Sequence, residues 1–541
     1  MLGRTVQEFL AGAAGAVVLE DGAVAFDLSE AKYAISGEYN KCLLHLWSTE
    51  RNTVRRVLDA EVKNGILRLA VQRLGQARPT KLEICRERDR RTPTAKRAAR
   101  AAYESKLKRA IERHFTGFAV GRLTSGVDLE KSFGPIYARG VISHGQTAFA
   151  VLGVNASETQ ASIDAALTFG ILWMDVCREN PHFPQNRGEM KHSRFVEGLI
   201  LFVPAGCSGL VRERMANLNR AAAKWRLFEF DERHDAVVEV DCTDRGNVAT
   251  RLVHATNETA ALDRFAESIA RIRTVLPNCD VEVLSPAEVA FRWRGLEFAR
   301  ARAGASFSHF SQPHGEMGHP TSFYNQEIVF GVGAEERVLE DRNWAQFAEL
   351  LTKLREARHP YGPRHEPLFR MHPERWLESL VVTDVSVIDE RLEAESVYSQ
   401  VPAFSAADRA MIDVLTLTRA GRLAVVELKA DEDIHLPLQG LDYWARVRWH
   451  HSRGEFLKFG YFGGREMAAE DPLLFLVAPA LRVHPATDAI LKYVSPEIEW
   501  AFVGIDERWR EGVRVVFRKR AHHGATQARR CLDWSEATRT A

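Results

Sequence analysis

A pattern that occurs twice constrains the fold of this chain more than any other sequence feature. Ala150–Asn155 lies over Ala424–Lys429 at an offset of 274 residues, and Leu199–Val203 lies over Leu473–Val477 at the same offset. Matching segments at a fixed spacing are the sign of an internal repeat. The chain is therefore expected to contain two copies of one domain.

A tryptophan and a charged triplet extend the repeat. Trp225 followed by Asp231-Glu232-Arg233 lies over Trp500 followed by Asp506-Glu507-Arg508, with one residue of slippage. Apolar strands often overlay by chance, whereas a tryptophan followed at the same distance by the same charged triplet does not. We expect the copies to span about Tyr103 to Val240 and about Glu374 to Phe517.

Length and composition exclude several classes of protein. A chain of 541 residues is too long for one ordinary hydrophobic core. Its longest apolar runs fall well short of the roughly 20 residues of a membrane span, and no secretory signal is visible at the N-terminus, so a cytoplasmic protein without a membrane partner is expected. The seven cysteines are scattered and never form a C-x-x-C pair, which predicts buried free thiols. A net charge of +1 leaves room only for local basic patches.

The N-terminal region combines a β-rich stretch with a basic helix. Residues from about Ala34 to Ile84 alternate polar and apolar side chains, which predicts an antiparallel β-rich module. The following stretch, about Arg86 to Arg113, is strongly basic and helical in pattern. Arg97 and Arg100 are candidate phosphate contacts there, although a solvated helix face explains the charges equally well.

The middle of the chain offers histidines but no recognisable metal motif. Helices are expected over Ala260 to Val275 and Trp344 to Arg355, and a strand over Gln326 to Gly331. Three histidines lie between them, and three more follow: His309, His314, His319, His359, His365 and His372. Their spacing fits no zinc template, so polar loops are the preferred interpretation.

Two strands in the last third of the chain carry the most informative residues. Met411–Thr418 and Arg422–Lys429 alternate as strands around a tight turn centred on Ala420. A three-residue loop would make Asp413 and Glu427 cross-strand partners on one face, with Cβ atoms about 4.5–5.5 Å apart. The neighbouring apolar residues would face a core on the other side.

The chemistry of this hairpin points to a divalent cation. Lys429 is two positions beyond Glu427, so the pleat places its ammonium on the same face. Two carboxylates this close repel each other, and a cation such as Mg²⁺ or Mn²⁺ would relieve the repulsion while activating a water molecule. Lys429 would position or help to deprotonate that water and neutralise a phosphate. The alternative is a salt-bridged hairpin edge, which an isolated triplet would favour.

The helix predicted after this hairpin adds two residues to the pattern. Leu436–Val447 is predicted to be a helix with Pro437 in its first turn and with Gln439 and Tyr443 on one face. Together with Asp413 and Glu427-Leu428-Lys429, this order and spacing resemble the PD-(D/E)xK nuclease superfamily, particularly its RecB-type branch with a Q-x-x-x-Y helix. The resemblance covers about Pro373 to Trp449, and Ile412 replaces the proline that the family often has before the Asp.

The resemblance implies a metal-dependent hydrolase of phosphodiester bonds. Asp413, Glu427 and the Leu428 carbonyl would bind Mg²⁺ or Mn²⁺, while Gln439 and Tyr443 would border the site. The family also tends to have a glutamate on the preceding helix, for which Glu378 is the better candidate because Glu374 is explained as a helix N-terminal acid. Glu378 would assist metal binding directly or through water. Beyond the Q-x-x-x-Y helix, a basic cluster is expected either to contact phosphates or to form a solvated helix end: Arg446, Arg448 and Arg453.

The earlier copy lacks these residues. In place of Asp413, Glu427, Lys429, Gln439 and Tyr443 the overlay offers Arg139 or Gly140, Gly153, Asn155, Ala165 and Phe169. It is therefore expected to bind no metal in this manner. Nucleases of this superfamily frequently act as homodimers, so the copy would serve as a built-in pseudo-partner, with a plain packing role as the alternative.

These observations predict an α/β (α+β) chain with two tandem restriction-endonuclease-like domains, each a mixed sheet flanked by helices and preceded by an accessory region. The expected divisions are a β-rich domain at 1–95, a degenerate nuclease-like domain at 96–245, a connecting α/β region at 246–365, a nuclease domain at 366–523 and a flexible tail at 524–541. The expected substrate is nucleic acid, DNA rather than RNA. The alternative is a catalytically silent nucleic-acid-binding or assembly protein with a relic nuclease fold.

Overall fold

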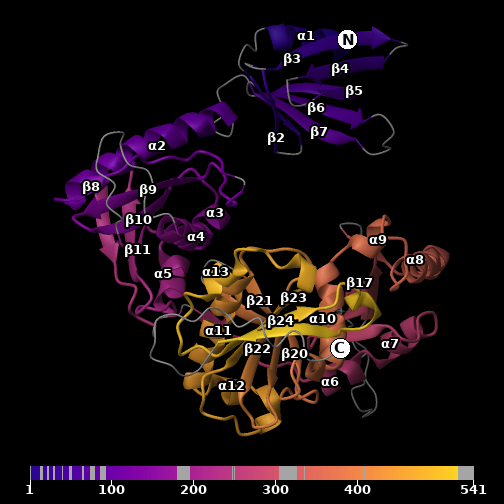
Figure 1. The fold of residues 1–541 in the computed structure, drawn as a ribbon. Coiled ribbons are helices and arrows are strands. Elements are labelled where there is room, and N and C mark those ends of the chain that lie inside the picture. Colours follow the sequence, from indigo (N-terminus) through magenta and orange to yellow (C-terminus); the bar gives the residue numbers. More distant parts are fainter. Residues whose placement is uncertain are drawn as a thin grey trace, which may run out of the picture.

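The structure is a computed structural model of the chain. It describes residues 2–521 except 12–15, 21–22, 29–30, 39–40, 48–51, 64–65, 74–78, 86–92, 129, 180–194, 246–247, 249, 304–325, 334–335 and 406–408. The described residues form an α/β protein with four β-sheets. Figure 1 shows the N-terminal sheet as an upper lobe, with the remaining sheets in the lobes below it.

The N-terminal lobe is an antiparallel sheet with the strand order β2-β1-β7-β6-β5-β4-β3. Helix α1 (Leu2–Ala11) buries Val6, Phe9 and Leu10 against it. This confirms the antiparallel β-rich character expected for this stretch. The strands are β1 (Val17–Glu20), β2 (Ala23–Asp27), β3 (Lys32–Glu38), β4 (Lys41–Trp47), β5 (Asn52–Lys63), β6 (Ile66–Arg73) and β7 (Thr80–Cys85).

The first mixed sheet follows α2 (Pro93–His114) and has the order β13-β12-β11-β10-β9-β8. Helix α2 covers one face through Tyr103, Leu107 and Ile111, and α4 with α5 covers the other. Its elements are β8 (Ala119–Val120), β9 (Tyr137–His144), β10 (Thr147–Val154), α3 (Gln160–Asp164), α4 (Ala166–Glu179), β11 (Phe195–Pro204), α5 (Gly209–Ala216), β12 (Lys224–Asp231) and β13 (Ala236–Val240).

The second mixed sheet has the order β14-β20-β21-β22-β23-β24-β25. Helix α10 (Pro373–Thr383) packs on one face through Trp376, Leu377 and Val381, and α11 (Leu436–Ser452) packs on the other. The other elements are β14 (Thr250–Leu252), β20 (Tyr398–Ser405), β21 (Arg409–Leu417), β22 (Leu423–Leu428), α12 (Glu455–Lys458), β23 (Leu473–Pro479), α13 (Thr487–Leu491), β24 (Trp500–Ile505) and β25 (Val515–Arg520).

Strands β9 to β13 of the first mixed sheet repeat the order and directions of β21 to β25 in the second. In each sheet the first pair is antiparallel, the next two pairs are parallel and the last is antiparallel. The central parallel pair even keeps its register, since Ala150 lies opposite Leu199 as Val425 lies opposite Leu474. This shared topology agrees with the repeat in the sequence.

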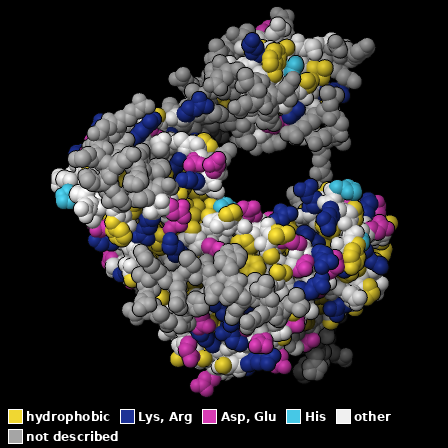
Figure 2. Space-filling view, viewed as in Figure 1, with side chains coloured by type: hydrophobic (Ala, Val, Ile, Leu, Met, Phe, Trp, Pro, Cys, Tyr) yellow, Lys and Arg dark blue, Asp and Glu magenta, His cyan; other side chains and the backbone are white. Residues whose placement is uncertain are grey.

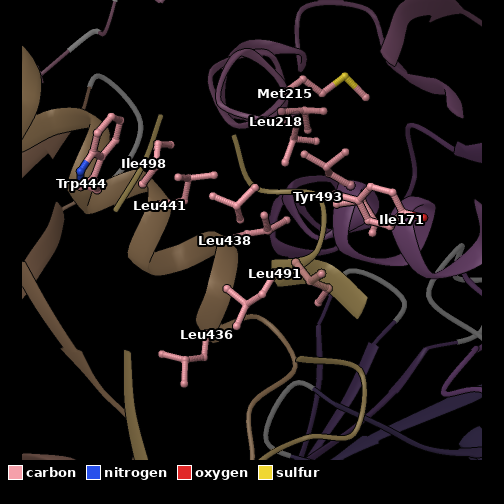
Figure 3. Close-up of a cluster of buried hydrophobic side chains, with 14 of the residues drawn as sticks. Ile171, Met215, Leu218, Leu436, Leu438, Leu441, Trp444, Leu491, Tyr493 and Ile498 are labelled. Carbon is pink, nitrogen blue, oxygen red and sulfur yellow. The ribbon is translucent and has the colours of Figure 1, made fainter. Parts of the chain in front are cut away.

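The two mixed sheets share one hydrophobic core. Helix α4 of the first contacts α13 of the second, and α5 of the first contacts α11 of the second, so corresponding helices meet reciprocally. Figure 3 shows Ile171, Met215 and Leu218 of the first copy lying against Leu438 and Leu491 of the second. Buried apolar surface therefore joins the copies directly.

Polar contacts across this interface are also reciprocal. Arg214 of α5 makes a buried ion pair with Asp442 of α11, with Nη2 and Oδ2 2.7 Å apart. On the other side Tyr493, just after α13, donates to Asp175 of α4 over 2.7 Å. Corresponding helices of the two copies thus hold each other, although the polar residues that do so occupy different positions.

The connecting region forms the fourth sheet, β15-β16-β17-β18-β19, packed against α6, α7 and α8. Strand β14, at the start of this stretch of the chain, pairs instead with β20 at the edge of the second mixed sheet. The elements are α6 (Glu258–Arg264), α7 (Ala266–Arg273), β15 (Asp280–Ser285), β16 (Glu288–Trp293), β17 (Leu296–Ala303), β18 (Gln326–Phe330), β19 (Arg337–Val338), α8 (Trp344–Ala357) and α9 (Pro367–Arg370).

A buried arginine fastens this region to α10. Arg358 donates to the backbone carbonyls of Arg294, Met371 and His372 and lies 4.8 Å from the ring centroid of Trp376. Because a buried guanidinium is tolerated only when its donors are satisfied, this set of carbonyls fixes the start of α10. Among the described residues, no helix is both long and apolar enough to cross a membrane.

Candidate active site

The β21–β22 hairpin has the register expected from the sequence. Val414 pairs with Val426 and Leu417 with Leu423; the paired residues end there, and Asp413 and Glu427 are the next positions in this register. The turn contains Gly421 at φ +82°, a left-handed conformation that glycine adopts without strain. The predicted pairing of the two strands is therefore confirmed.

Glu427 lies on the face of the sheet that α11 covers, because a Cβ at Gly440 of that helix would lie 3.7 Å from the Cβ of Glu427. Asp413 Oδ2 accepts a hydrogen bond of 2.9 Å from the backbone N–H of Leu428. Glu427 is only 1% exposed, and its Oε1 lies 3.2 Å from Nζ of Lys429. The other oxygen of Glu427, Oε2, is buried and has no hydrogen-bond partner. A buried carboxylate oxygen without a partner is costly, so this atom marks the position where a ligand would bind.

Burial raises the pKa values of both carboxyl groups, Asp413 and Glu427. Burial, followed by the charge of Asp413, raises the pKa of Glu427 well above its usual range. Burial also raises the pKa of Asp413, against the opposing hydrogen bond from Leu428. Burial alone would lower the pKa of Lys429, but the charges of Glu427, Glu374 and Asp413 raise it, so the ammonium stays charged.

Glu378 of α10 is linked to Asp413 through Gln400, a residue that the sequence pattern did not indicate. Gln400 donates from Nε2 to Glu378 Oε2 over 2.8 Å and to Asp413 Oδ1 over 3.2 Å. Gln400 lies within β20 at φ +50°, a conformation that costs a non-glycine residue of the order of 1–3 kcal/mol. Such strain at a point between two carboxylates indicates a functional constraint on the backbone.

Glu378 itself is buried, with 5% of its surface exposed. Burial raises its pKa to about 7, with Arg375 opposing the shift and Asp413 adding to it. Arg375 donates from Nη1 to Glu378 over 2.8 Å. Glu374 is about half exposed and lies 3.9 Å from Lys429, so it belongs to the rim of the site and Glu378 to its interior.

The predicted helix α11 brings its two site residues to the sheet. Gln439 donates from Nε2 to the Tyr443 hydroxyl over 3.3 Å. Between them Gly440 packs so closely that a Cβ there would lie 2.3 Å from Leu476 and 3.7 Å from the Cβ of Glu427. This close approach positions Gln439 and Tyr443 beside the carboxylates, where burial raises the pKa of Tyr443.

Only a few residues of this site offer oxygen atoms that could bind a divalent cation. Among the described residues no group of three or more His, Cys, Asp and Glu is gathered as a metal site. Asp413 and Glu427 face each other, and Gln400 separates Asp413 from Glu378. The residues fit Mg²⁺ or Mn²⁺, because these ions need only one or two carboxylates and keep several water ligands.

The basic residues predicted to contact phosphate lie along the second half of α11 and just beyond it. Arg446 is buried, with 3% exposed, and Arg448 pairs with Asp471 at 2.9 Å. Arg453 pairs with Glu455 beyond the end of α11. Gln439 is 14 residues from Arg453, or about 21 Å along a helix. Arg453 therefore lies at the end of α11 that points away from the carboxylates, whereas the guanidinium carbon of Arg446 lies 5.9 Å from the ring centroid of Tyr443.

The candidates on α2 belong to the first copy. Arg100 forms a half-buried ion pair of 2.7 Å with Glu158, which accounts for its charge. Arg97 is exposed.

His309, His314 and His319 lie outside the described residues. Of the described cysteines, three are buried and three are half-buried free thiols, which agrees in part with the expectation.

The first copy has no acidic pair at the positions that correspond to Asp413 and Glu427. The residues that occupy these positions differ, however, from those that the sequence overlay predicted. His144 and Thr147 pair across a turn of two residues, whereas the turn of the second hairpin has three. The number that converts a residue of the first copy into its counterpart in the second is therefore 274 on β9 and 275 on β10. Leu152, opposite Arg139, therefore corresponds to Glu427, and Gly153 faces the other way. By the same shift Val154, and not Asn155, corresponds to Lys429.

The two remaining positions in the first copy serve packing. Ala165 joins α3 to α4, and Phe169 stacks on Tyr137 with 4.8 Å between ring centroids. Arg139 lies 4.5 Å from the ring centroid of Phe133.

Comparison of the chain with models of protein families, with curated proteins and with solved structures finds no match.

Proposed function

We propose that this chain is a divalent-metal-dependent nuclease of the PD-(D/E)xK type, with the RecB-type arrangement of site residues. The observation that carries the proposal is the facing pair Asp413 and Glu427, with a buried carboxylate oxygen that lacks a partner and with Lys429 at 3.2 Å. A stabilising buried ion pair normally has hydrogen bonds to its remaining oxygen atoms as well. The two mixed sheets would then be tandem restriction-endonuclease-like domains, the first degenerate.

The residues have distinct tasks in phosphodiester hydrolysis. Asp413, Glu427 and the Leu428 carbonyl would bind Mg²⁺ or Mn²⁺, which supplies a Lewis acid and a more acidic water. Lys429, held in its charged form by the carboxylates, neutralises the negative charge that develops on the phosphate. It is thus better suited to positioning the water than to deprotonating it.

The proton from the attacking water needs an acceptor near neutral pH. Glu378, with a pKa of about 7, has the acidity that suits general base catalysis. Gln439 and Tyr443 hold the carboxylate strand from the α11 side. We further propose that DNA is the substrate, that the protein acts in the cytoplasm, and that the first copy serves as a built-in partner.

A cleavage assay tests the function. The full chain is incubated with single- and double-stranded DNA in Mg²⁺, Mn²⁺ or EDTA, and cleavage is expected only with metal. Lys429→Ala should lower the rate at least about 100-fold. Lys458→Ala, on α12, is the matched control and should cleave normally. Metal-independent cleavage, or full activity of the Lys429 variant, would refute the proposal. A silent relic of a nuclease would bind DNA without cutting it.

A further inference from the structure

Three segments of the second copy end at the same edge of the sheet as the site. Strands β22, β23 and β24 are parallel, so their carboxyl ends lie together. Lys429 follows β22, Leu481 and Arg482 follow β23, and Arg510 follows β24. The backbone N–H of Leu481 donates to Glu507 over 2.6 Å, which joins the last two segments. Ligands of such sheets bind outside the carboxyl ends of the strands.

Arg510 is fixed at this edge by aromatic rings. Its guanidinium carbon lies 4.1 Å from the ring centroid of Trp509, 4.9 Å from that of Phe369 and 5.2 Å from that of Trp376. Its Nε is buried without a hydrogen-bond partner. Since Phe369 belongs to α9 and Trp376 to α10, Arg510 links this edge to the helix that carries Glu378.

Two further arginines share the electrostatic field of Arg510. Burial lowers the pKa of Arg510, Asp431 opposes the shift, and Arg364 and Arg482 add to it. Arg482 Nη1 lies 3.5 Å from Asp431 Oδ1. Arg364, Arg482 and Arg510 thus lie close enough to repel one another, Asp431 is the counter-charge that acts on Arg510, and an anion would relieve the repulsion further. Figure 2 shows Lys and Arg side chains gathered over the region of α9 and α10.

Large apolar side chains stand beside these arginines. Leu481 is 84% exposed and Tyr361 is 78% exposed, more than any other large hydrophobic residue among those the structure describes. Leu481 precedes Arg482, and Tyr361 is three residues before Arg364. Single exposed apolar residues are common, but here the two most exposed of them are close in sequence to two arginines of the cluster.

We propose that this edge binds a single-stranded segment of nucleic acid and leads it to the carboxylates, an inference that rests on the proposed nuclease function. Arg364, Arg482 and Arg510 contact phosphates, while Tyr361 and Leu481 contact unpaired bases. Alternating cations and exposed apolar surface suit a single strand, because a duplex hides the faces of its bases and offers mainly phosphates.

Binding is measured apart from cleavage. The full chain with Asp413→Asn, in EDTA, is titrated into fluorescently labelled DNA of about 20 nucleotides, either single-stranded or duplex, and anisotropy is recorded. Replacing both Tyr361 and Leu481 with Ala should weaken single-strand binding at least about 5-fold and leave duplex binding unchanged. Replacing both Arg364 and Arg482 with Ala should reduce the slope of log affinity against log salt by about 1.4 for single strands.

The control replaces Arg448 and Arg453 with Ala at the far end of α11, and it should change neither quantity. Thermal melting of each variant confirms that it is folded. An unchanged salt slope, or equal losses for single strands and duplex, would overturn the proposed surface. If the wild-type chain cuts DNA while these variants bind normally, the surface is wrong and the nuclease function stands. If the variants lose binding as expected but the wild type never cuts, the nuclease function is wrong.

Discussion

Replacing Glu378 with Gln tests the electrostatics of the site quantitatively. The ordinary pKa of the carboxyl is 4.5, and in the folded chain burial raises it to about 7. The folded state therefore holds this proton more tightly than the unfolded state does. The stability that protonated Glu378 contributes is fully present below pH 4.5 and is lost as the pH rises through about 7. At about 1.4 kcal/mol for each unit of pKa, the loss reaches about 3 kcal/mol by about pH 8.

Gln has the same shape and cannot ionise, so the variant escapes this loss. Urea unfolding in the absence of metal, at intervals from about pH 4 to about pH 8, should show the variant gaining about 3 kcal/mol relative to the wild type. Glu349→Gln, on the exposed face of α8, is the control. Lys353 lowers the pKa of Glu349, so that variant should show no such gain with rising pH.

A difference between wild type and Glu378→Gln that stays constant across this pH range would refute the reasoning. It would mean that the carboxyl is ionised at its ordinary pKa and is solvated or paired more fully than its burial implies. The same experiment with saturating Mg²⁺ extends the test. An ion bound beside Glu378 favours its ionised form, so the advantage of the variant should shrink.

Three further predictions concern the site and the interface. Glu427→Gln should abolish the rise in melting temperature that Mn²⁺ gives the wild type, whereas a persisting rise would place the ion elsewhere. Gln400→Ala should weaken Mn²⁺ binding measured by calorimetry, because it frees Asp413 to move; unchanged affinity would make Gln400 merely structural. Asp442→Ala leaves Arg214 buried without its carboxylate, so the free energy of urea unfolding should fall by about 3–5 kcal/mol. A loss below about 1 kcal/mol would show that water reaches this pair.

Local patterns predicted the second hairpin well. The period-2 alternation and the turn placed Asp413 opposite Glu427, and the structure has that register. Helix α11 begins at Leu436, where Pro437 in the first turn indicated a start. These features depend on residues close in sequence, so the sequence alone can fix them.

Contacts between distant segments could not be predicted in this way. Gln400 joins the site because β20 lies beside β21 and its backbone turns to φ +50°, which no spacing in the sequence signals. The arginines at the carboxyl ends of β23 and β24 meet only once the sheet is assembled. The overlay of the two copies was one residue out at Gly153, because a difference in turn length is invisible to an alignment without gaps.

The core shared by α4 and α11 has a consequence for behaviour on dilution. A dimer held by these contacts would dissociate as its concentration fell, and a site that needs its partner would then fail. Here both halves belong to one chain, so their encounter is intramolecular and independent of protein concentration. We therefore expect the specific activity per mole of chain to stay constant on serial dilution. If the first half has no catalytic role, as the proposed function holds, it needs only to keep the buried face around Ile171 and Met215 intact.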